Sequence, residues 1–380
     1  MNGTKKKTII AAILALSVAL SAGAYEYVKN EYVKKQAEEE AALLAQQEAE
    51  KLAAEQEAAR QAEEEREKKG YGDNPLTGLV IADSALGKRP VAIMVENSES
   101  ARPQWGMDDE NYSPDIIMEG EVESGITRTL WIYADYAALP EQIGPVRSAR
   151  PPYIRFSELF DAFYIHWGQS ETLGSYIGAD DVLVEDGVDN INQLDYKSSV
   201  EFFTRSNERN VGLEHTGVIL GKNLPQVIED YGYRTAVDKN KCTTFTFYDD
   251  ETRVSDTDCN EIIIDVSPRS WTKHWTYSEE DGLYHTDDFK NNLTRKNIIV
   301  MYDETQYITK PRASFSYCNY ALGGGEGKYA TQGSVIDISW NVEDGKLVFR
   351  DTDGQIIKLN HGKTYIAWIS ANNGGNIEIK

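Results

Sequence analysis

Short apolar runs separated by turn residues dominate the chain from about residue 71 onward. Arg89–Glu96 is one continuous apolar run, typical of a strand buried on both faces. Asp115–Glu119 and Ile126–Ala134 flank a Glu-Ser-Gly sequence at 123–125, and this arrangement predicts a β-hairpin. Ala162–Trp167 is a further run of strand length. We therefore expect a sheet in this part of the chain.

Helical periodicity alternates with these strands. Aromatic residues lie on one face of a predicted helix, at Tyr153, Phe156, Phe160 and Phe163. Pro151 and Pro152 suit its first turn, where a missing N–H does no harm. Further helices are expected over Glu171–Ile177, which Gly178 would end, over Ser199–Arg205 and over Leu224–Tyr231. The mixture predicts an α/β domain with a mixed sheet over residues 71–233.

The pattern changes beyond about residue 235, where short strands and turns replace the helices. Asp344-Gly345 and Asp353-Gly354 are typical hairpin turns. Seven segments have strand character: TTFTFYD, EIIIDVS, KNIIVMYDE, SVIDISWN, KLVFRDTD, QIIKLN and KTYIAWIS. They predict a smaller, mainly antiparallel β domain over 234–380, a barrel or a sandwich. The fold class expected for the whole chain is α+β.

The first 25 residues resemble an export signal. Lys5, Lys6 and Lys7 precede an uncharged run of 18 residues, Thr8–Tyr25. A signal peptide cleaved at Ala24 would release the protein, whereas an uncleaved segment would anchor it in the membrane. In both cases the basic residues lie on the cytoplasmic side and the rest of the chain is exported.

Residues 26–70 favour the anchor. Up to Lys69 this segment consists almost entirely of Glu, Ala, Gln, Lys and Arg, without Gly or Pro, which predicts a charged helical stalk. Its few large aliphatic residues do not sustain a heptad seam, so we expect weak self-association at most and no tight coiled coil. A low-complexity linker is the alternative. A stalk has a purpose only on a tethered protein, so we expect a single-pass membrane protein with its C-terminal part outside the cell.

Net charge excludes one class of partner. The chain carries −23, of which the leader contributes +3 and residues 26–69 contribute −5, leaving −21 for Gly70–Lys380. Such a surface repels nucleic acid. We expect no nucleic-acid partner, and instead a component of the cell wall or envelope.

Neither a metal site nor a cofactor is expected. Cys242, Cys259 and Cys318 have no metal-ligand spacing. Gly327-Lys328 lacks the first Gly and the Ser or Thr of a phosphate-binding loop. Export would permit a Cys242–Cys259 disulfide, and three free thiols are the other interpretation.

Arg147 and Arg150 are candidates for anion binding. They precede the predicted helix at Pro151, whose N-terminus presents free N–H groups and partial positive charge. Guanidinium groups there would hold a carboxylate or phosphate in bidentate fashion. The alternative is that they form ion pairs with some of the chain's 62 acidic residues.

Arg128 lies on the strand face that Leu130 and Ile132 share, so its guanidinium is expected to be buried and to need a partner. Glu119 and Glu121 on the preceding strand are the expected partners. A structural ion pair is one interpretation. In the other, this network lines the same pocket as the two loop arginines, and either glutamate is available as a general base.

His166 ends a predicted strand, a position at which ligands collect in mixed sheets. It is a candidate ligand-binding residue or proton shuttle, and a core histidine is the alternative. His215 is a comparable candidate.

Several segments together resemble the YerB family of bacterial envelope lipoproteins, which is common in Gram-positive bacteria. They are NPLTGL, KRPVAIMVEN, ARPQWG, DIIMEGEVESGITRTLWIY, IGPVRSARP and FDAFYIHWGQSE, followed by KNIIVMYDE, VIDISW and FRDTDGQIIKLNHGKTYIAWI. The resemblance covers roughly Asn74–Ile369. It implies two tandem family domains on the outer face of the membrane and implies no activity or catalytic residues. The leader reads SAGAYEY, without the lipid-attachment cysteine, so a peptide anchor would replace the lipid.

Three functions remain open from the sequence. The first is a membrane-tethered extracytoplasmic protein that binds an anionic ligand, such as a cell-wall fragment, through Arg128, Arg147, Arg150 and His166. The second is an envelope hydrolase or transferase that uses Glu119 or Glu121 as base, His166 as proton shuttle and the arginines to stabilise negative charge. The third is a scaffold without a ligand or catalysis.

Overall fold

The computed structural model describes residues 34–36, 46, 51, 71–107, 112–311 and 314–380. The expected leader and nearly all of the expected stalk lie outside these ranges. Within them, no helix combines the length and the apolar character that a membrane span requires. Residues Gly70–Lys380 form a compact unit of their own.

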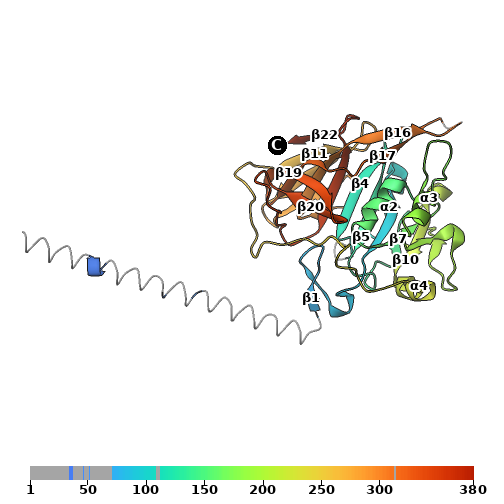
Figure 1. Ribbon diagram of the computed structural model, residues 1–380, viewed down its shortest axis with the longest axis horizontal. Helices are drawn as coiled ribbons and strands as arrows, with labels where there is room; N and C mark the ends of the chain where they lie inside the picture. Colours follow the sequence, from blue (N-terminus) through green and yellow to red (C-terminus); the bar gives the residue numbers. More distant parts are fainter. Residues whose placement is uncertain (1–33, 37–45, 47–50, 52–70, 108–111, 312–313) are drawn as a thin grey trace, which may run out of the picture. The chain divides into compact units, whose positions relative to one another are not determined.

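A twelve-stranded mixed sheet runs through this unit (Figure 1). Its main path follows the order β20-β19-β18-β15-β21-β4-β5-β3-β7-β8, and the hairpin β16–β17 attaches to β4. The strands, in chain order, are β3 (Val91–Glu96), β4 (Ile116–Glu123), β5 (Ile126–Tyr133), β7 (Phe163–His166), β8 (Asn190–Asn192), β15 (Asn297–Asp303), β16 (Thr305–Thr309), β17 (Ser316–Tyr320), β18 (Gly325–Thr331), β19 (Ser334–Glu343), β20 (Lys346–Arg350) and β21 (Thr364–Ser370).

Smaller sheets complete the β structure of the described residues. One has the order β6-β10-β9, another has the order β14-β13-β12-β11-β22, and β1 pairs with β2. Their strands are β1 (Tyr71–Asp73), β2 (Val80–Ala82), β6 (Gln142–Ile143), β9 (Phe203–Arg205), β10 (Gly217–Leu220), β11 (Glu261–Asp265), β12 (Lys273–Ser278), β13 (Leu283–Thr286), β14 (Leu293–Arg295) and β22 (Asn376–Ile379).

Helices are short and few in the described ranges. The α-helices are α2 (Pro151–Glu158), α3 (Ala179–Glu185) and α4 (Leu224–Tyr231). Single 3₁₀ turns are η1 (Asp83–Ala85), η2 (Glu99–Ala101), η3 (Gln193–Asp195), η4 (Leu213–His215) and η5 (Gly221–Asn223).

Each face of the central sheet packs against its own hydrophobic cluster. Met94, Met118 and Leu130 face α2 and α3 on one side, and Figure 1 shows α2 lying across β4 and β5. Ile93 and Trp131 face the other side, where the three-stranded sheet, the five-stranded sheet and α4 pack. Alternate residues of each strand point to opposite faces, so a strand buried on both sides must be apolar, as β3 is from Val91 to Val95.

The central sheet joins the N-terminal and C-terminal parts of the compact unit. β21 pairs in parallel with β15 on one side and with β4 on the other. The second pairing runs from Ile116↔Thr364 to Gly120↔Trp368. The C-terminal part is therefore mainly antiparallel, as expected, but its strand β21 takes part in parallel pairing across the boundary.

Most local predictions for the N-terminal part are confirmed. β3, β4, β5 and β7 lie where the apolar runs predict strands, and α2 begins at Pro151. The β4–β5 turn has φ of 55° at Ser124 and 82° at Gly125, and left-handed turn residues of this kind match the twist of a hairpin. α4 occupies the predicted range.

Two predicted helices are wrong. Glu171–Ile177 forms irregular turns, because Asp180 accepts hydrogen bonds from the backbone N–H and the hydroxyl of Thr172, and Gly178 precedes α3 instead of ending a helix. Residues 199–202 form a bend and irregular chain, and Phe203–Arg205 is strand β9, because Phe203 pairs with Ile219 in the β9–β10 ladder.

Two predicted strands, 243–249 and 355–360, are also wrong. The backbone N–H groups of Thr243, Phe245 and Tyr248 donate to three separate segments, so no regular ladder forms. An alternation of apolar and polar residues cannot distinguish an extended segment that packs on the core without a ladder from a strand that is paired in a sheet.

Candidate functional site

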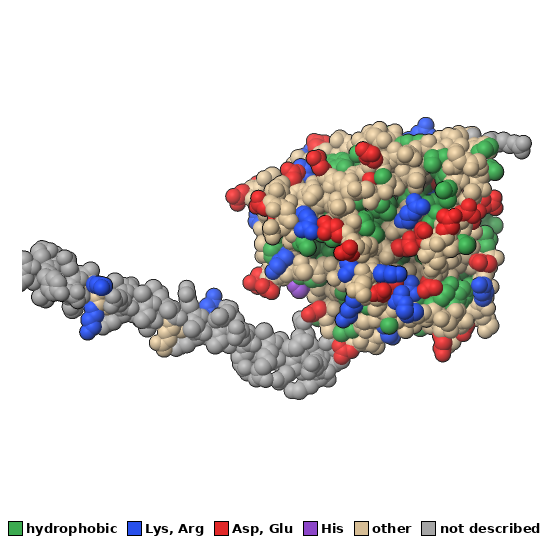
Figure 2. All heavy atoms as spheres, in the orientation of Figure 1, with side chains coloured by type: hydrophobic (Ala, Val, Ile, Leu, Met, Phe, Trp, Pro, Cys, Tyr) green, Lys and Arg blue, Asp and Glu red, His purple; other side chains and the backbone are tan. Residues whose placement is uncertain are grey.

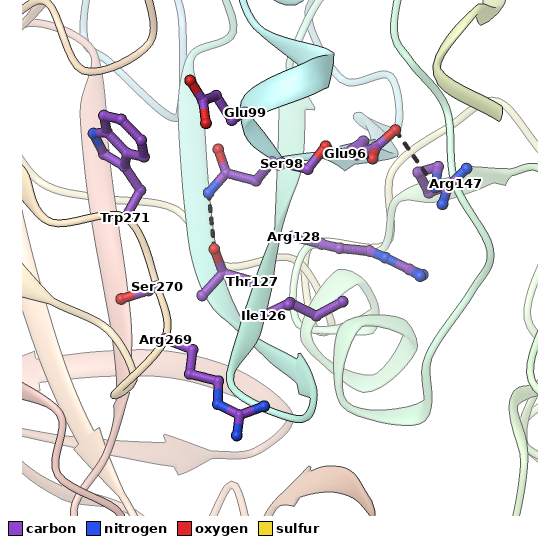
Figure 3. A pocket seen from close by; sticks show the side chains of 11 residues that line it. Glu96, Ser98, Glu99, Ile126, Thr127, Arg128, Arg147, Arg269, Ser270 and Trp271 are labelled. Atoms are coloured by element: carbon purple, nitrogen blue, oxygen red, sulfur yellow. Dashed lines mark hydrogen bonds and ion pairs between the residues drawn. The ribbon is translucent and has the colours of Figure 1, made fainter. Parts of the chain in front are cut away.

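A cavity of about 290 Å³ lies where the end of β3, the start of β5, the loop before α2 and a loop of the C-terminal part meet (Figure 3). The loop before α2 is held along β3, since Arg147 N–H donates to Met94 O at 2.9 Å and Glu96 N–H donates to Pro145 O at 2.9 Å. The residues that line the cavity are Glu96, Asn97, Ser98, Glu99, Ile126, Thr127, Arg128, Arg147, Arg269, Ser270 and Trp271.

Glu123 holds two of the three predicted arginines. Arg150 donates from Nε and Nη2 to the two carboxylate oxygens, at 2.9 and 2.7 Å. Arg128 approaches the same carboxylate at 3.3 Å and also donates to Ser148 O. The guanidinium of Arg128 is buried and paired, as expected, whereas Arg150 does not line the cavity.

The expected partners of Arg128 are wrong, and the hairpin register explains why. Gly120 lies opposite Arg128, so Glu119 and Glu121 point to the other face of the sheet. A β-bulge between Glu121 and Glu123 then reverses the alternation. Glu123, opposite Ile126, consequently shares the face of Arg128.

Two guanidinium groups sharing one carboxylate leave an excess of positive charge. Burial alone would raise the pKa of Glu123, but the charges of Arg128 and Arg150 outweigh burial and lower it. Burial lowers the pKa of Arg128 to about 10, and the nearby charge of Arg150 acts in the same direction. Arg128 therefore lies in an environment that an additional anion would relieve.

Arg147 reaches the cavity in a less enclosed setting. Its side chain is 29% exposed, Nε lies 3.6 Å from a carboxylate oxygen of Glu96, and Nη1 donates to Glu214 O at 2.8 Å. Glu96 also accepts from Ser98 Oγ at 2.7 Å and contacts His215 Nδ1 at 2.9 Å. Glu96 is thus shared among several donors and does not neutralise Arg147 alone.

Sequence reasoning missed the cavity residues that the C-terminal part supplies. Arg269 is exposed, and its guanidinium donates to Ser124 O at 3.4 Å and forms no ion pair with any described carboxylate. Trp271 is 45% exposed and lies on the side of the cavity opposite Arg147 (Figure 3). The signal in the sequence is a tryptophan and an arginine in the polar loop between two strands, at Pro268–Trp271.

Glu119 lies beneath the cavity floor, fully buried. Its oxygens accept from Thr127 Oγ1 at 2.8 Å, Tyr365 Oη at 2.8 Å and the buried Lys273 Nζ at 3.2 Å. Burial lowers the pKa of Lys273, although Glu119 opposes that effect. This network ties β4 to β12 and holds the loop that carries Trp271, because Lys273 Nζ also donates to Trp271 O at 2.9 Å.

Glu121 and His166 lie apart from the cavity-lining set. Glu121 accepts from Gly125 N–H at 2.8 Å and from Tyr307 Oη at 2.7 Å. His166 is fully buried, with Nδ1 2.7 Å from Gly168 O and Nε2 3.1 Å from Asn190 Oδ1. Burial lowers its pKa. The structure therefore brings Arg128 and Arg147 together at the cavity and places Glu119, Glu121, Arg150 and His166 outside its lining.

The thiols and potential metal ligands do not add to this site. Cys242, Cys259 and Cys318 are free and buried, and burial raises the pKa of Cys242 to about 12. Across residues 71–107, 112–311 and 314–380, with the few described before them, no three His, Cys, Asp or Glu side chains gather as metal ligands.

Comparisons with known proteins agree with this architecture. A family model described as "Protein of unknown function (DUF3048) N-terminal domain" matches residues 76–234, and the corresponding C-terminal domain matches 264–366. The cavity lies between these two domains, since Arg128 and Arg147 belong to the first and Arg269 and Trp271 to the second.

YerB of Bacillus subtilis (strain 168) is 27% identical over an alignment of 304 residues, which covers 77% of this chain and 84% of that protein. The crystal structure of Bacillus subtilis YerB matches with a TM-score of 0.64 and 25% identity, covering 81% of this chain and 99% of the other. The two family models match consecutive parts of the chain, and YerB matches more than three quarters of it. The chain therefore belongs to the YerB-like family, with its N-terminal and C-terminal DUF3048 domains in tandem.

Proposed function

We propose that this protein is tethered to the membrane, faces the outside of the cell and binds an anionic ligand of the cell wall in the cavity between its two family domains. The observation that carries the proposal is an imbalance of charge at the cavity. Arg128, Arg147 and Arg269 line it, and Arg269 has no carboxylate partner among the described residues.

Three carboxylates oppose these arginines: Glu99 is 68% exposed and lies 3.7 Å from Lys290 Nζ, and the other two are already shared. Glu96 is shared by Arg147, Ser98 and His215, and Glu123 is shared by two arginines. Guanidinium groups bind carboxylates and phosphates in planar, bidentate geometry, so the cavity suits either group on a ligand. Clefts between domains are also one of the places where ligand sites preferentially occur.

Tethering rests on two further observations. The N-terminal sequence has three lysines before an uncharged run, followed by a charged segment of stalk-like composition. The Bacillus subtilis relative carries the name "Putative lipoprotein YerB". A lipid in the relative and a peptide anchor in this chain would place both proteins at the same membrane surface.

The test is binding of the full-length chain in detergent to purified sacculi and to defined wall fragments. Replacing Arg269 by Gln should weaken binding about 10- to 100-fold, because a hydrogen bond to a charged group contributes about 1.5–3 kcal/mol. Arg147→Gln should act in the same direction.

Arg253→Gln is the matched control, since Arg253 is an exposed arginine outside the cavity that pairs with Asp258 at 2.8 Å. Equal binding by wild type, Arg269→Gln and Arg147→Gln would reject the proposal. Mass spectrometry of the same mixtures would reveal any fragment that is cleaved or joined, and such a product would favour an enzyme over a binding protein.

A further inference from the structure

A second cavity, of about 440 Å³, lies on the other side of the β4–β5 turn. Arg269 lines both cavities, and the residues beside it, Pro268 and Ser270, belong to one cavity each. In the same way the turn contributes Ser124 and Gly125 to the second cavity and Ile126 to the first. The two cavities therefore adjoin, separated by the tip of the hairpin and the side chain of Arg269.

Gly125 allows Arg269 to occupy this dividing position. A Cβ atom at residue 125 would lie 2.9 Å from Cβ of Arg269 and 3.0 Å from its Cγ, so the aliphatic stem rests directly on the glycine. Figure 3 shows Arg269 beside the hairpin tip, with its guanidinium directed away from Arg128 and Arg147. The guanidinium of Arg269 thus lies at the boundary, where it can meet an anionic group of a ligand that spans the two cavities.

The second cavity differs from the first in chemistry. Its aromatic side chains, Tyr307 and Phe315, are each 38% exposed. Besides Arg269 and Glu121, its polar groups are the hydroxyls of Ser124, Ser314 and Ser316 and the amide of Asn373, whose Nδ2 donates to Tyr307 Oη. The carboxylate of Glu121 is already bound by Gly125 N–H and Tyr307 Oη. Exposed aromatic faces beside neutral hydrogen-bonding groups suit sugar rings, which have apolar C–H faces and hydroxyl edges.

We infer that the two cavities form one groove for a sugar polymer that carries carboxylates: a carboxylate substituent binds in the first cavity, and the adjoining neutral sugar rings bind in the second. This inference rests on the proposed function and specifies its ligand. Trp271 on one side of the hairpin tip, with Phe315 and Tyr307 on the other, would contact the polymer along its length.

The experiment compares binding of three probes to the full-length chain in detergent. They are a disaccharide-peptide monomer, glycan strands of several such units from the same sacculi, and the neutral sugar chain chitohexaose. We expect the strands to bind at least tenfold more tightly than the monomer. Phe315→Ala and Asn373→Ala should each remove most of that gain and leave the affinity for the monomer unchanged.

Two controls separate this inference from the proposed function. Tyr112→Ala removes a 49%-exposed aromatic outside both cavities and should change nothing. Arg147→Gln should weaken the monomer and the strands alike and leave chitohexaose binding unaffected. If strands and monomer bind equally, or if Phe315→Ala and Asn373→Ala leave their ratio unchanged, the single groove is wrong while the anion site stands. If none of the anionic probes binds, both proposals fall.

Discussion

Glu123 determines the charge of the cavity wall, although its own side chain is only 13% exposed. Arg128 and Arg150 both depend on its carboxylate, and both arginine side chains are more buried than Glu123 itself. A charge in this setting must be paired, because the loss of its hydration is not otherwise compensated. The same carboxylate leaves one positive charge in excess, which is what an anionic ligand would meet.

Glu123→Ala is expected to lower the free energy of unfolding by about 3–5 kcal/mol, because it leaves two buried guanidinium groups without their carboxylate. Urea denaturation measures the change. Glu99→Ala is the control, since Glu99 is 68% exposed and its contact with Lys290 is 3.7 Å, so its effect should stay within about 0.5 kcal/mol. Equal effects of the two substitutions would contradict this role for Glu123.

The stabilisation by Glu123 should also depend on pH. Its pKa is lowered in the folded state, so the folded protein binds fewer protons than the unfolded chain in the acidic range. The contribution is complete above the unfolded pKa of about 4.3 and is lost as pH falls through the lower folded pKa. The stability difference between wild type and Glu123→Ala should therefore shrink below about pH 4.3. A difference independent of pH would argue against an ionised Glu123.

The buried Glu119–Lys273 pair allows a test of coupling. Lys273→Met should cost about 3–5 kcal/mol, because it strands the carboxylate of Glu119 in the core. The double variant Glu119→Gln with Lys273→Met should lose less than the sum of its two single changes, with a coupling of about 1–3 kcal/mol. Denaturant midpoints of the four proteins complete the cycle. Simple additivity would show that the pair does not act as a unit.

At the level of elements, the β4–β5 hairpin is both a structural turn and the ridge between the two cavities. Its Gly125 has φ of 82° and carries the stem of Arg269. The hairpin β19–β20 offers a comparison, because its Gly345 has φ of 76° and a Cβ atom there would have no neighbour within 4 Å. Glycine is therefore needed at residue 345 only for its left-handed backbone. At residue 125 it is needed both for its left-handed backbone and for the close contact with Arg269.

Gly125→Ala and Gly345→Ala should each cost about 1–2 kcal/mol of stability, since both force a side chain into left-handed backbone. Only Gly125→Ala should also weaken ligand binding, because its new methyl group displaces Arg269. Thermal unfolding and binding to glycan strands measure the two effects. Equal binding by the two variants would show that the position of Arg269 does not matter.

At the level of the whole molecule, the two family domains share one sheet and one pair of hydrophobic clusters. Removing the C-terminal domain would leave one edge of β4 without a partner along Ile116–Gly120, while β5 still pairs with the other edge, and would expose one side of both clusters. Exposed, apolar strand edges promote aggregation. The net charge of −21 would oppose aggregation through repulsion between molecules. Acidic and basic side chains are interspersed on the face that Figure 2 shows, however, so no uniformly negative surface repels a second chain there.

A chain that ends at residue 233 should accordingly fail to unfold cooperatively and should aggregate, whereas Gly70–Lys380 should unfold in one transition. Circular dichroism during heating, together with size-exclusion chromatography, distinguishes these outcomes. A monomeric fragment with a sharp melting transition would show that the N-terminal domain is independent of the rest.

Local pattern was sufficient to predict β3, the β4–β5 hairpin, α2 and the burial of Arg128. Each of these depends on residues that are neighbours in sequence. The partner of Arg128 could not be predicted, because one bulge between Glu121 and Glu123 changes which carboxylate faces it. The helix expected over Glu171–Ile177 failed for a similar reason, since the side chain of Asp180 holds the segment in turns.

The cavity itself could be predicted only in part. Arg128 and Arg147 belong to the N-terminal domain, and their position near one another follows from local structure. Arg269 and Trp271 come from a loop more than 100 residues further along the chain. Nothing in the spacing of a single sequence connects that loop to the hairpin. The position of the cavity between two domains therefore required the structure.

The parallel pairing of β4 with β21 also determines when the central sheet can be completed during synthesis. The paired residues are about 250 positions apart in sequence. The edge of β4 in the middle of the sheet therefore has no partner until almost the whole chain has been synthesised. At roughly 5–20 residues per second, β4 would wait about 12–50 s for its neighbour. Contacts this distant in sequence also slow folding once the chain is complete. During that interval the open edge of β4 in a nascent chain is exposed to proteases and to other nascent chains. A chaperone that covers this edge would therefore protect the chain until β21 is synthesised.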